Sequence, residues 1–138
     1  MKKQFSFLLR ILFWDALVIL CLLTIAANAA PTPYKLSVYH NASERGVISP
    51  GCAAIVEITG GEFSVESFQV VRNPLPYDLV GVTVTIGGNQ AAIRLVSPTK
   101  LAIIAPDVTF PSRMRRLAWF KVTVTTPSDT FTGWAAYA

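Results

Sequence analysis

The sequence predicts an all-β fold, an immunoglobulin-like sandwich of two sheets with seven or eight strands, preceded by a signal peptide. Short segments after residue 30 alternate apolar and polar side chains with a period of two, which is typical of half-buried strands. These segments recur about every ten residues, and glycine, proline or asparagine separates them. The prolines between Pro50 and Pro127 leave no stretch in which an amphipathic helix of three turns could form. Together these observations favour a sandwich over a helical fold.

The first thirty residues differ from the rest and predict a secretory signal peptide at 1–29. Residues 1–10 carry three basic side chains and no acid, residues 11–27 are largely apolar, and Ala-Asn-Ala at 27–29 supplies the small residues that a signal peptidase recognises. Cleavage there implies a protein that is secreted, at the cell surface or in the periplasm. An uncleaved anchor stays open as the alternative, although Asp15 would be costly inside a bilayer.

The net charge of the remaining chain is small. The whole sequence has 12 basic and 8 acidic side chains and a net charge of +4. Three of the bases and one of the acids lie in residues 1–29, so the rest of the chain carries a net charge of +2. This excludes nucleic acid as an expected partner, because domains that bind it present strongly basic faces. A membrane is expected as a partner only if the first segment is left uncleaved.

Eight segments fit a strand, each a short run of β-branched, aromatic or other apolar residues next to turn residues. In chain order they are residues 34–39, 53–59, 68–72, 80–86, 91–96, 100–105, 120–125 and 130–137. The clearest is 80–86, where apolar residues point to one face and Thr83 and Thr85 point to the other. The weakest is 68–72, which is short and ends just before Pro74.

Turn residues set how these strands connect. Residues 87–90, Gly-Gly-Asn-Gln, suit a tight turn because glycine and asparagine adopt positive φ at little cost. Residues 91–96 are therefore expected to return as the partner strand of 80–86. Further turns are expected at 97–99 and 127–129, each of which contains a proline and a serine.

Residues 73–88, Asn-Pro-Leu-Pro-Tyr-Asp-Leu-Val-Gly-Val-Thr-Val-Thr-Ile-Gly-Gly, resemble the central motif of a bacterial immunoglobulin-like module related to IPT/TIG domains. The Ser-Pro-Thr turn at 97–99 and the Ser-Pro-Gly turn at 49–51 are similar to the family pattern at matching spacing. We assign residues 30–46 to an N-terminal strand and connector, and residues 47–138 to the immunoglobulin-like domain. The resemblance implies a module that is found at the C-terminus of secreted or cell-surface proteins. It also implies that the module binds other molecules and is not an enzyme.

The Pro74-Leu75-Pro76 segment predicts an extended connector at the edge of the sandwich. Its two prolines fix φ and remove two amide donors, so the segment cannot be a central strand. Leu75 is expected to be its anchor, buried between the two sheets. Cys52, the one cysteine after residue 29, precedes an apolar run, and we expect it to be buried and inert. Pairing of Cys52 between chains stays open as the alternative.

The sequence contains no recognisable set of residues for catalysis or for a metal. His40 is the only histidine and is expected to be an exposed turn residue. No Gly-x-Ser-x-Gly elbow and no EF-hand loop occurs, and the acids are dispersed. A loop calcium site that uses Asp107 or Asp129 with backbone carbonyls stays open. We therefore expect a protein that is not an enzyme and has no catalytic residues, no cofactor and no metal.

Two features are candidate ligand contacts. Arg113, Arg115 and Arg116 form the one cluster of charge, either a solvated turn or a contact for an acidic polysaccharide or a phosphate surface. Trp119 and Trp134 lie in the last two predicted strands. Because Trp119 and its neighbour Phe120 must face opposite sides of one strand, one aromatic should be exposed and could stack on a sugar ring.

These features support two hypotheses. The first is an exported non-enzymatic module for cell-surface or extracellular interaction with a protein or polysaccharide. The alternative is a small carbohydrate-binding protein that uses exposed aromatics and the basic loop. An immunoglobulin-like fold alone does not choose between them, because it hosts many unrelated functions.

Overall fold

The computed structural model describes residues 10–14, 16, 33–111, 113 and 116–138 of the chain. The chain divides into two units, residues 1–32 and residues 33–138. In the first unit, residues 10–14 and 16 are helical, and most of the predicted signal peptide lies outside the described residues. Among the residues that are described, no helix has the length and apolarity needed to cross a membrane.

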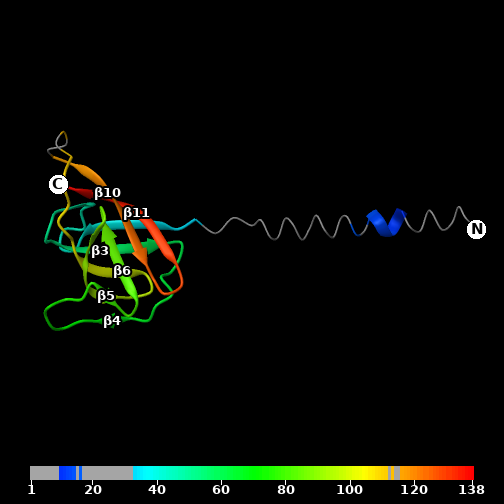
Figure 1. Cartoon of the computed structure of the whole chain (residues 1–138), viewed down its shortest axis with the longest axis horizontal. Helices are drawn as coiled ribbons and strands as arrows, with labels where there is room; N and C mark the ends of the chain where they lie inside the picture. Colours follow the sequence, from blue (N-terminus) through cyan, green and yellow to red (C-terminus); the bar gives the residue numbers. More distant parts are fainter. Residues whose placement is uncertain (1–9, 15, 17–32, 112, 114–115) are drawn as a thin grey trace, which may run out of the picture. The chain divides into compact units, whose positions relative to one another are not determined.

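The second unit consists of two β-sheets packed on each other, which confirms the all-β sandwich (Figure 1). The first sheet has the strand order β1 (Lys35–His40), β3 (Ala53–Thr59), β9 (Lys100–Ile104), β8 (Ala92–Val96) and β4 (Phe68–Gln69). The second sheet has the order β2 (Val47–Ile48), β11 (Thr130–Tyr137), β10 (Ala118–Thr125), β6 (Val82–Ile86) and β5 (Asp78–Leu79), and β7 (Asn89–Gln90) also pairs with β6. Neighbouring strands are antiparallel except for β2 and β11, which are parallel.

The seven strands of five or more residues are arranged as in an immunoglobulin constant-type domain. Lettered A to G in chain order, they form one sheet with the order A-B-E-D (β1-β3-β9-β8) and one with the order G-F-C (β11-β10-β6). Short strands add to both sheets, and β2 extends the second sheet beyond β11. Because β1 pairs with β3 along its whole length, the first sheet includes residues that we assigned to an N-terminal strand and connector.

The core lies between the sheets and is built from alternate residues of each strand. In β6, Val82, Val84 and Ile86 are fully buried, while Thr83 and Thr85 between them are partly exposed. The strands β3 and β9 repeat this alternation, and β10 follows it in its second half. The hydrophobic pattern of the sequence therefore predicts the inward face of the main strands.

The expectation that residues 91–96 return as the partner strand of β6 is wrong. Gly87 and Gly88 do form the predicted turn, with φ of 59° and 85°, but only the short strand β7 pairs back onto β6. The chain then crosses to the first sheet, where β8 pairs with β9 and β4. The crossing places Ala91 and Ile93 in the core, where both are fully buried. This burial of apolar surface favours the crossing over a longer hairpin.

The proline-rich connector runs along the edge of the first sheet, but Leu75 is not its buried anchor. The carbonyl of Pro76 accepts a hydrogen bond from the N–H of Ile93 at 2.8 Å, which fixes the connector to β8. Leu75 is only half-buried, so the prediction that it lies between the sheets is wrong. Leu79 is the buried leucine of this region, because its strand β5 pairs with β6 and directs it into the core.

One core aromatic lies outside every strand and was not predicted. Phe63 is fully buried in the segment between β3 and β4. Its ring packs edge-on against Phe131 of β11, with ring centroids 5.3 Å apart, and Tyr34 packs on the same phenylalanine at 5.2 Å. The backbone N–H of Phe63 donates to the carbonyl of Pro98 at 2.8 Å. This residue therefore fastens a loop to both sheets.

Gly133 allows the two sheets to approach closely at the edge formed by β1 and β11. A Cβ atom added to Gly133 would lie 2.8 Å from Cβ of Leu36 and 3.2 Å from its backbone oxygen. Nearby, the hydroxyl of Tyr34 accepts a hydrogen bond from the N–H of Thr132 at 3.0 Å. The absence of a side chain at position 133 is therefore required for this contact between layers.

Gly133→Ala is expected to lower the free energy of unfolding by about 1–3 kcal/mol, because the new methyl group overpacks a contact whose other partner is partly backbone. Gly46→Ala is the matched control, since a Cβ atom added at Gly46 meets nothing within 4 Å. Urea denaturation followed by tryptophan fluorescence measures both. Equal stability of the two variants would contradict the close approach.

Candidate binding face

Trp119 of β10 and Trp134 of β11 present their side chains on the outer face of the second sheet. They are 63% and 60% exposed, whereas Phe120 is half-buried and packs against the core. The prediction that Trp119 and Phe120 face opposite sides of the strand is therefore confirmed. Trp119 lies opposite Ala136 in the register, and Trp134 lies opposite Lys121. The two indoles are thus diagonal neighbours on adjacent strands, a spacing that aromatic side chains can bridge.

Ala136 is the cross-strand partner of Trp119 and lies on the same outer face of the sheet. It lies between two inward-facing residues of β11, Ala135 and Tyr137, so its own side chain points outward, yet it is only 2% exposed. Its cross-strand neighbours are Trp119 on one side and Val47 of β2 on the other. We call the surface made by Trp119, Lys121, Trp134, Ala136 and Val47 the tryptophan face.

Two rows of threonines continue the outer surface of the sheet away from the tryptophan face. The rows run across β6, β10 and β11 and consist of Thr85, Thr123 and Thr132, then Thr83, Thr125 and Thr130. Strands in a sheet are about 4.8 Å apart, and residues on one face of a strand are about 7 Å apart. The hydroxyl and methyl groups therefore form a small regular array next to the indoles.

Lys121 is the one charge of the tryptophan face. It is exposed, it lies opposite Trp134, and it is on the same face of β10 as Trp119. On its other side the partner is the backbone of Gly87, whose N–H donates to the carbonyl of Lys121 at 3.0 Å. No carboxylate is among these neighbours. Two acids lie further along this side of the sheet: Asp78 is beside Thr83, at the far row of threonines, and Asp107 is beside the β6–β7 turn, where its carbonyl accepts from Asn89.

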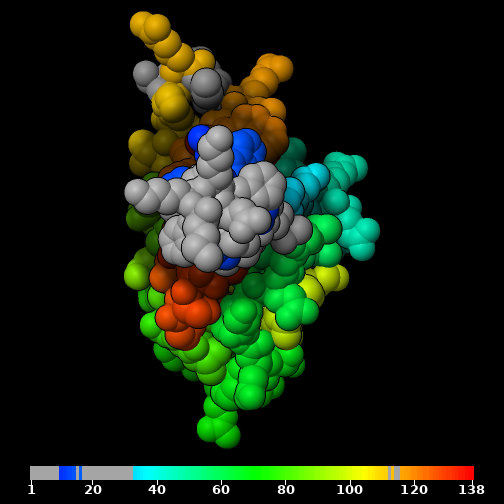
Figure 2. Space-filling model, turned by 90° about the vertical axis from the view of Figure 1, so that its right-hand side faces the viewer, coloured from blue at the N-terminus to red at the C-terminus, as the bar shows by residue number. Residues whose placement is uncertain are grey.

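The basic loop lies directly before β10. Arg113 and Arg116 are exposed, and the remaining candidate, Arg115, lies outside the described residues. Residues on either side of this loop, gold and orange in Figure 2, project from one end of the domain. Because Arg116 is three positions before Trp119, their Cα atoms are at most about 11 Å apart. The chain length alone therefore keeps one arginine of the loop near Trp119.

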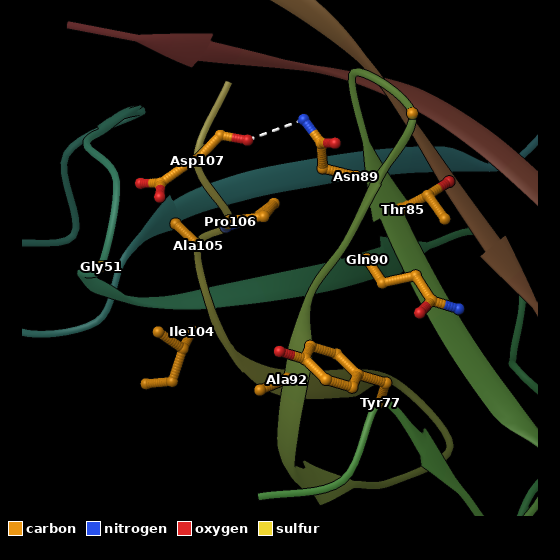
Figure 3. Close-up of a pocket in the computed structure, with 11 residues that line it drawn as sticks. Gly51, Tyr77, Thr85, Asn89, Gln90, Ala92, Ile104, Ala105, Pro106 and Asp107 are labelled. Carbon is orange, nitrogen blue, oxygen red and sulfur yellow. Dashed lines mark hydrogen bonds between the residues drawn. The ribbon is translucent and has the colours of Figure 1, made fainter. Parts of the chain in front are cut away.

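A hollow of about 1000 Å³ opens beside the β6–β7 turn and shares Thr85 with the near row of threonines (Figure 3). Its polar lining consists of Tyr77, Thr85, Asn89, Gln90 and Asp107. The side-chain amide of Asn89 donates a hydrogen bond to the backbone carbonyl of Asp107 at 2.7 Å, so that amide is already engaged within the protein. The hollow contains one carboxylate and no basic side chain, which distinguishes it from the tryptophan face.

The residues weighed for catalysis or metal binding lie apart from these surfaces. His40 is the last residue of β1 and is half-buried, so the expectation of an exposed turn residue is wrong. Its Nδ1 accepts from the N–H groups of Ala42 and Ser43 at 3.2 and 3.3 Å, and the ring thereby closes the turn after β1. Across the described residues, no group of three histidine, cysteine or acidic side chains is placed to hold a metal ion.

Cys52 and Asp129 are both engaged in local structure, Cys52 by packing and Asp129 by hydrogen bonds in a turn. Cys52 was expected to be buried; it is half-buried and packs against the core. Asp129 closes the turn between β10 and β11, where its N–H donates to the hydroxyl of Thr126 at 3.0 Å and its carbonyl accepts from the Thr126 backbone at 2.8 Å. Both backbone groups of Asp129 are therefore used inside the turn.

On the outer face of the first sheet, Tyr39 is hydrogen-bonded to Glu57. The hydroxyl of Tyr39 donates to Oε2 of Glu57 on the neighbouring strand at 2.8 Å. Burial, and then the hydrogen bond and charge of Glu57, raise the pKa of Tyr39 to about 12. The tyrosine therefore stays neutral across the physiological range, and its hydroxyl is occupied by a protein partner.

Lys121 is the site residue that the sequence analysis missed. A usable signal was present, because a period of two along β10 places Lys121 on the same face as Trp119. Its position opposite Trp134 depends on the register between β10 and β11, which the sequence does not specify.

Comparisons with protein-family models, with curated proteins and with solved structures found no match to this chain.

Proposed function

We propose that this protein is an exported, non-enzymatic immunoglobulin-like module, of the type related to IPT/TIG domains, that binds a protein or polysaccharide at the cell surface or outside the cell. Export is supported by the composition of residues 1–29. The relation to the IPT/TIG type is supported by the resemblance of residues 73–88. The binding role rests on the tryptophan face.

The observation that carries the proposal is the exposure of two tryptophans side by side on one sheet. Large aromatics supply much of the buried area of a small domain, so leaving two indoles in solvent forgoes stabilisation that burial would give. Tryptophan is also among the side chains that contribute most to binding energy when a ligand covers them. Trp119 and Trp134 lie on regular strands, which hold them in fixed positions, as a binding site requires.

Carbohydrate binding is the second candidate function, and the threonine rows favour it. An indole stacks on the apolar face of a sugar ring, and hydroxyl groups nearby can exchange hydrogen bonds with the ring hydroxyls. Thr123 and Thr132 lie directly beside Lys121 and Trp134 in the register, so stacking and hydrogen-bonding groups share one surface.

Trp119→Ala and Trp134→Ala are each expected to reduce binding at least tenfold, because each removes a large contact area from the face. The full chain is expressed in a bacterial host, collected outside the cytoplasm and sequenced at its N-terminus. Its retention is then measured on a panel of insoluble polysaccharides and on intact cells.

Phe68→Ala is the matched control. Phe68 is also an exposed aromatic, 51% exposed, but it lies on β4 of the other sheet. This variant should bind as the unaltered protein does. Tryptophan variants that are folded by circular dichroism and bind normally would contradict the proposal, and so would an equal loss with Phe68→Ala.

A further inference from the structure

We infer that the tryptophan face binds an acidic polysaccharide, a chain of sugar rings that carry carboxylate, sulfate or phosphate groups. The inference rests on the proposed function and adds the class of ligand. It depends on three features of the face: the charge of Lys121 beside both indoles, the absence of acids among its cross-strand neighbours, and the hydroxyl-bearing surface beside it.

The first step is the sign and placement of charge. Lys121 is flanked by Trp119 along β10 and by Trp134 across the register. A ring stacked on either indole would therefore hold its substituents within reach of a cation. Arg116 adds a second positive charge two residues before the same strand begins. Asp78, which lies beside the far threonine row, is about 13 Å away along the sheet from the row of Lys121. Charge complementarity therefore favours an anion at the tryptophan end.

The second step separates an acidic sugar chain from an acidic peptide. A peptide strand that adds to a sheet would need free backbone groups at its edge, whereas Lys121 lies on an inner strand: β10 pairs with β11 along its whole length, and its residues 122–125 pair with β6. Around Lys121 the ligand therefore meets mainly side chains, and these are indole planes, hydroxyls and one ammonium group. Sugar rings match this set, because each has an apolar face for an indole and hydroxyl groups for the threonines.

The third step concerns a second copy of this chain. Symmetric dimers bring the same surface of two protomers together. A dimer formed through the tryptophan face would bring the cations Lys121 and Arg116 of one protomer near those of the other. No acid among the cross-strand neighbours of Lys121 would compensate them. Like charges placed together at an interface are unfavourable, so an anionic ligand fits this face better than its own copy.

The test compares polygalacturonate with the same polymer after full methyl esterification, which keeps the sugar rings and removes the charge. We expect the full chain to bind polygalacturonate at least tenfold more tightly than the ester, by affinity electrophoresis or calorimetry. Raising the salt concentration should weaken this binding, because ions screen exposed charges. Lys121→Gln should lower affinity for polygalacturonate about tenfold and lower affinity for the ester much less, because the ester carries no charge for the ammonium group to meet. Lys100→Gln, an exposed lysine on β9 of the other sheet, is the matched control and should have no effect.

The outcomes separate the inference from the proposed function. If the two polymers bind equally and binding still depends on Trp119 and Trp134, the inference is wrong and the proposed function stands. If polyglutamate binds as tightly as polygalacturonate, an acidic peptide is the better ligand and the inference is wrong. If the protein binds neither polymer, the inference is wrong, and binding to cells by the tryptophan variants then decides the proposed function. Loss of affinity with Lys100→Gln equal to that with Lys121→Gln would also overturn it.

Discussion

Phe63→Ala is expected to lower the free energy of unfolding by about 3–5 kcal/mol, a large part of the roughly 5–15 kcal/mol available to a domain of this size. The phenyl ring of Phe63 is fully buried, and it is the group that holds the loop between β3 and β4 against Phe131. With a slope near 2 kcal/mol per molar urea, the midpoint of urea denaturation should fall by about 2 M. Removal of the ring leaves a cavity that the packed strands on both sides cannot easily fill.

Two variants serve as controls for Phe63→Ala. Phe68→Ala removes an aromatic that is 51% exposed, so its effect should be about 0.5 kcal/mol or less. Leu75→Ala should be clearly milder than Phe63→Ala, because Leu75 is half-buried at the edge of the first sheet. A loss of stability for Leu75→Ala equal to that for Phe63→Ala would show that the connector, and not the loop, anchors this side of the sandwich.

The contrast between Phe63 and Leu75 shows what the sequence could predict and what it could not. Alternation identifies the strands that have one face in the core, so residues 53–59 and 130–137 were predicted with the bounds that the structure has. Phe63 lies in a segment without periodicity, and a single phenylalanine carries no signal about its burial. Leu75 between two prolines is typical of a buried anchor, but the hydrogen bond from Ile93 to Pro76 holds the connector at the sheet edge instead.

The pairing of strands was harder to predict than their positions. The Gly87-Gly88 turn is a strong local signal, and the turn does form. How far the hairpin extends beyond it depends on the burial of Ala91 and Ile93 in the other layer, which is a long-range effect. The short strands β2, β5 and β7 have two residues each, too few for a periodic pattern.

The candidate site follows the same rule. The geometry of a single strand predicts that Trp119 and Phe120 face opposite sides, and in the structure they do. The juxtaposition of Lys121 with Trp134 follows from a register between two strands, and that register is fixed by the turn at 126–129 and by the core residues behind the face. Sequence patterns thus identify which residues are presented, whereas the tertiary structure determines which of them act together.

Tyr137→Ala is expected to cost about 3–5 kcal/mol of unfolding free energy, although the residue is next to the end of the chain. Its ring is fully buried and packs edge-on against Phe120, with centroids 5.4 Å apart. Phe110 also packs edge-on against Phe120, with centroids 5.6 Å apart, so loss of the Tyr137 ring opens this aromatic cluster behind the tryptophan face. Burial also raises the pKa of the Tyr137 hydroxyl well above its usual value, so the group enters the core in its neutral form.

Tyr137→Phe separates the ring from the hydroxyl. The hydroxyl donates to the carbonyl of Pro106 at 3.3 Å, a long hydrogen bond, so its removal should cost about 1 kcal/mol or less. Urea denaturation of both variants, with the unaltered chain as reference, gives the two values. A loss with Tyr137→Phe as large as that with Tyr137→Ala would show that the bond to Pro106, rather than ring packing on Phe120, holds the last strand in place. The expected order, a small loss for phenylalanine and a large loss for alanine, follows because a fully buried ring contributes far more through packing than through one long hydrogen bond.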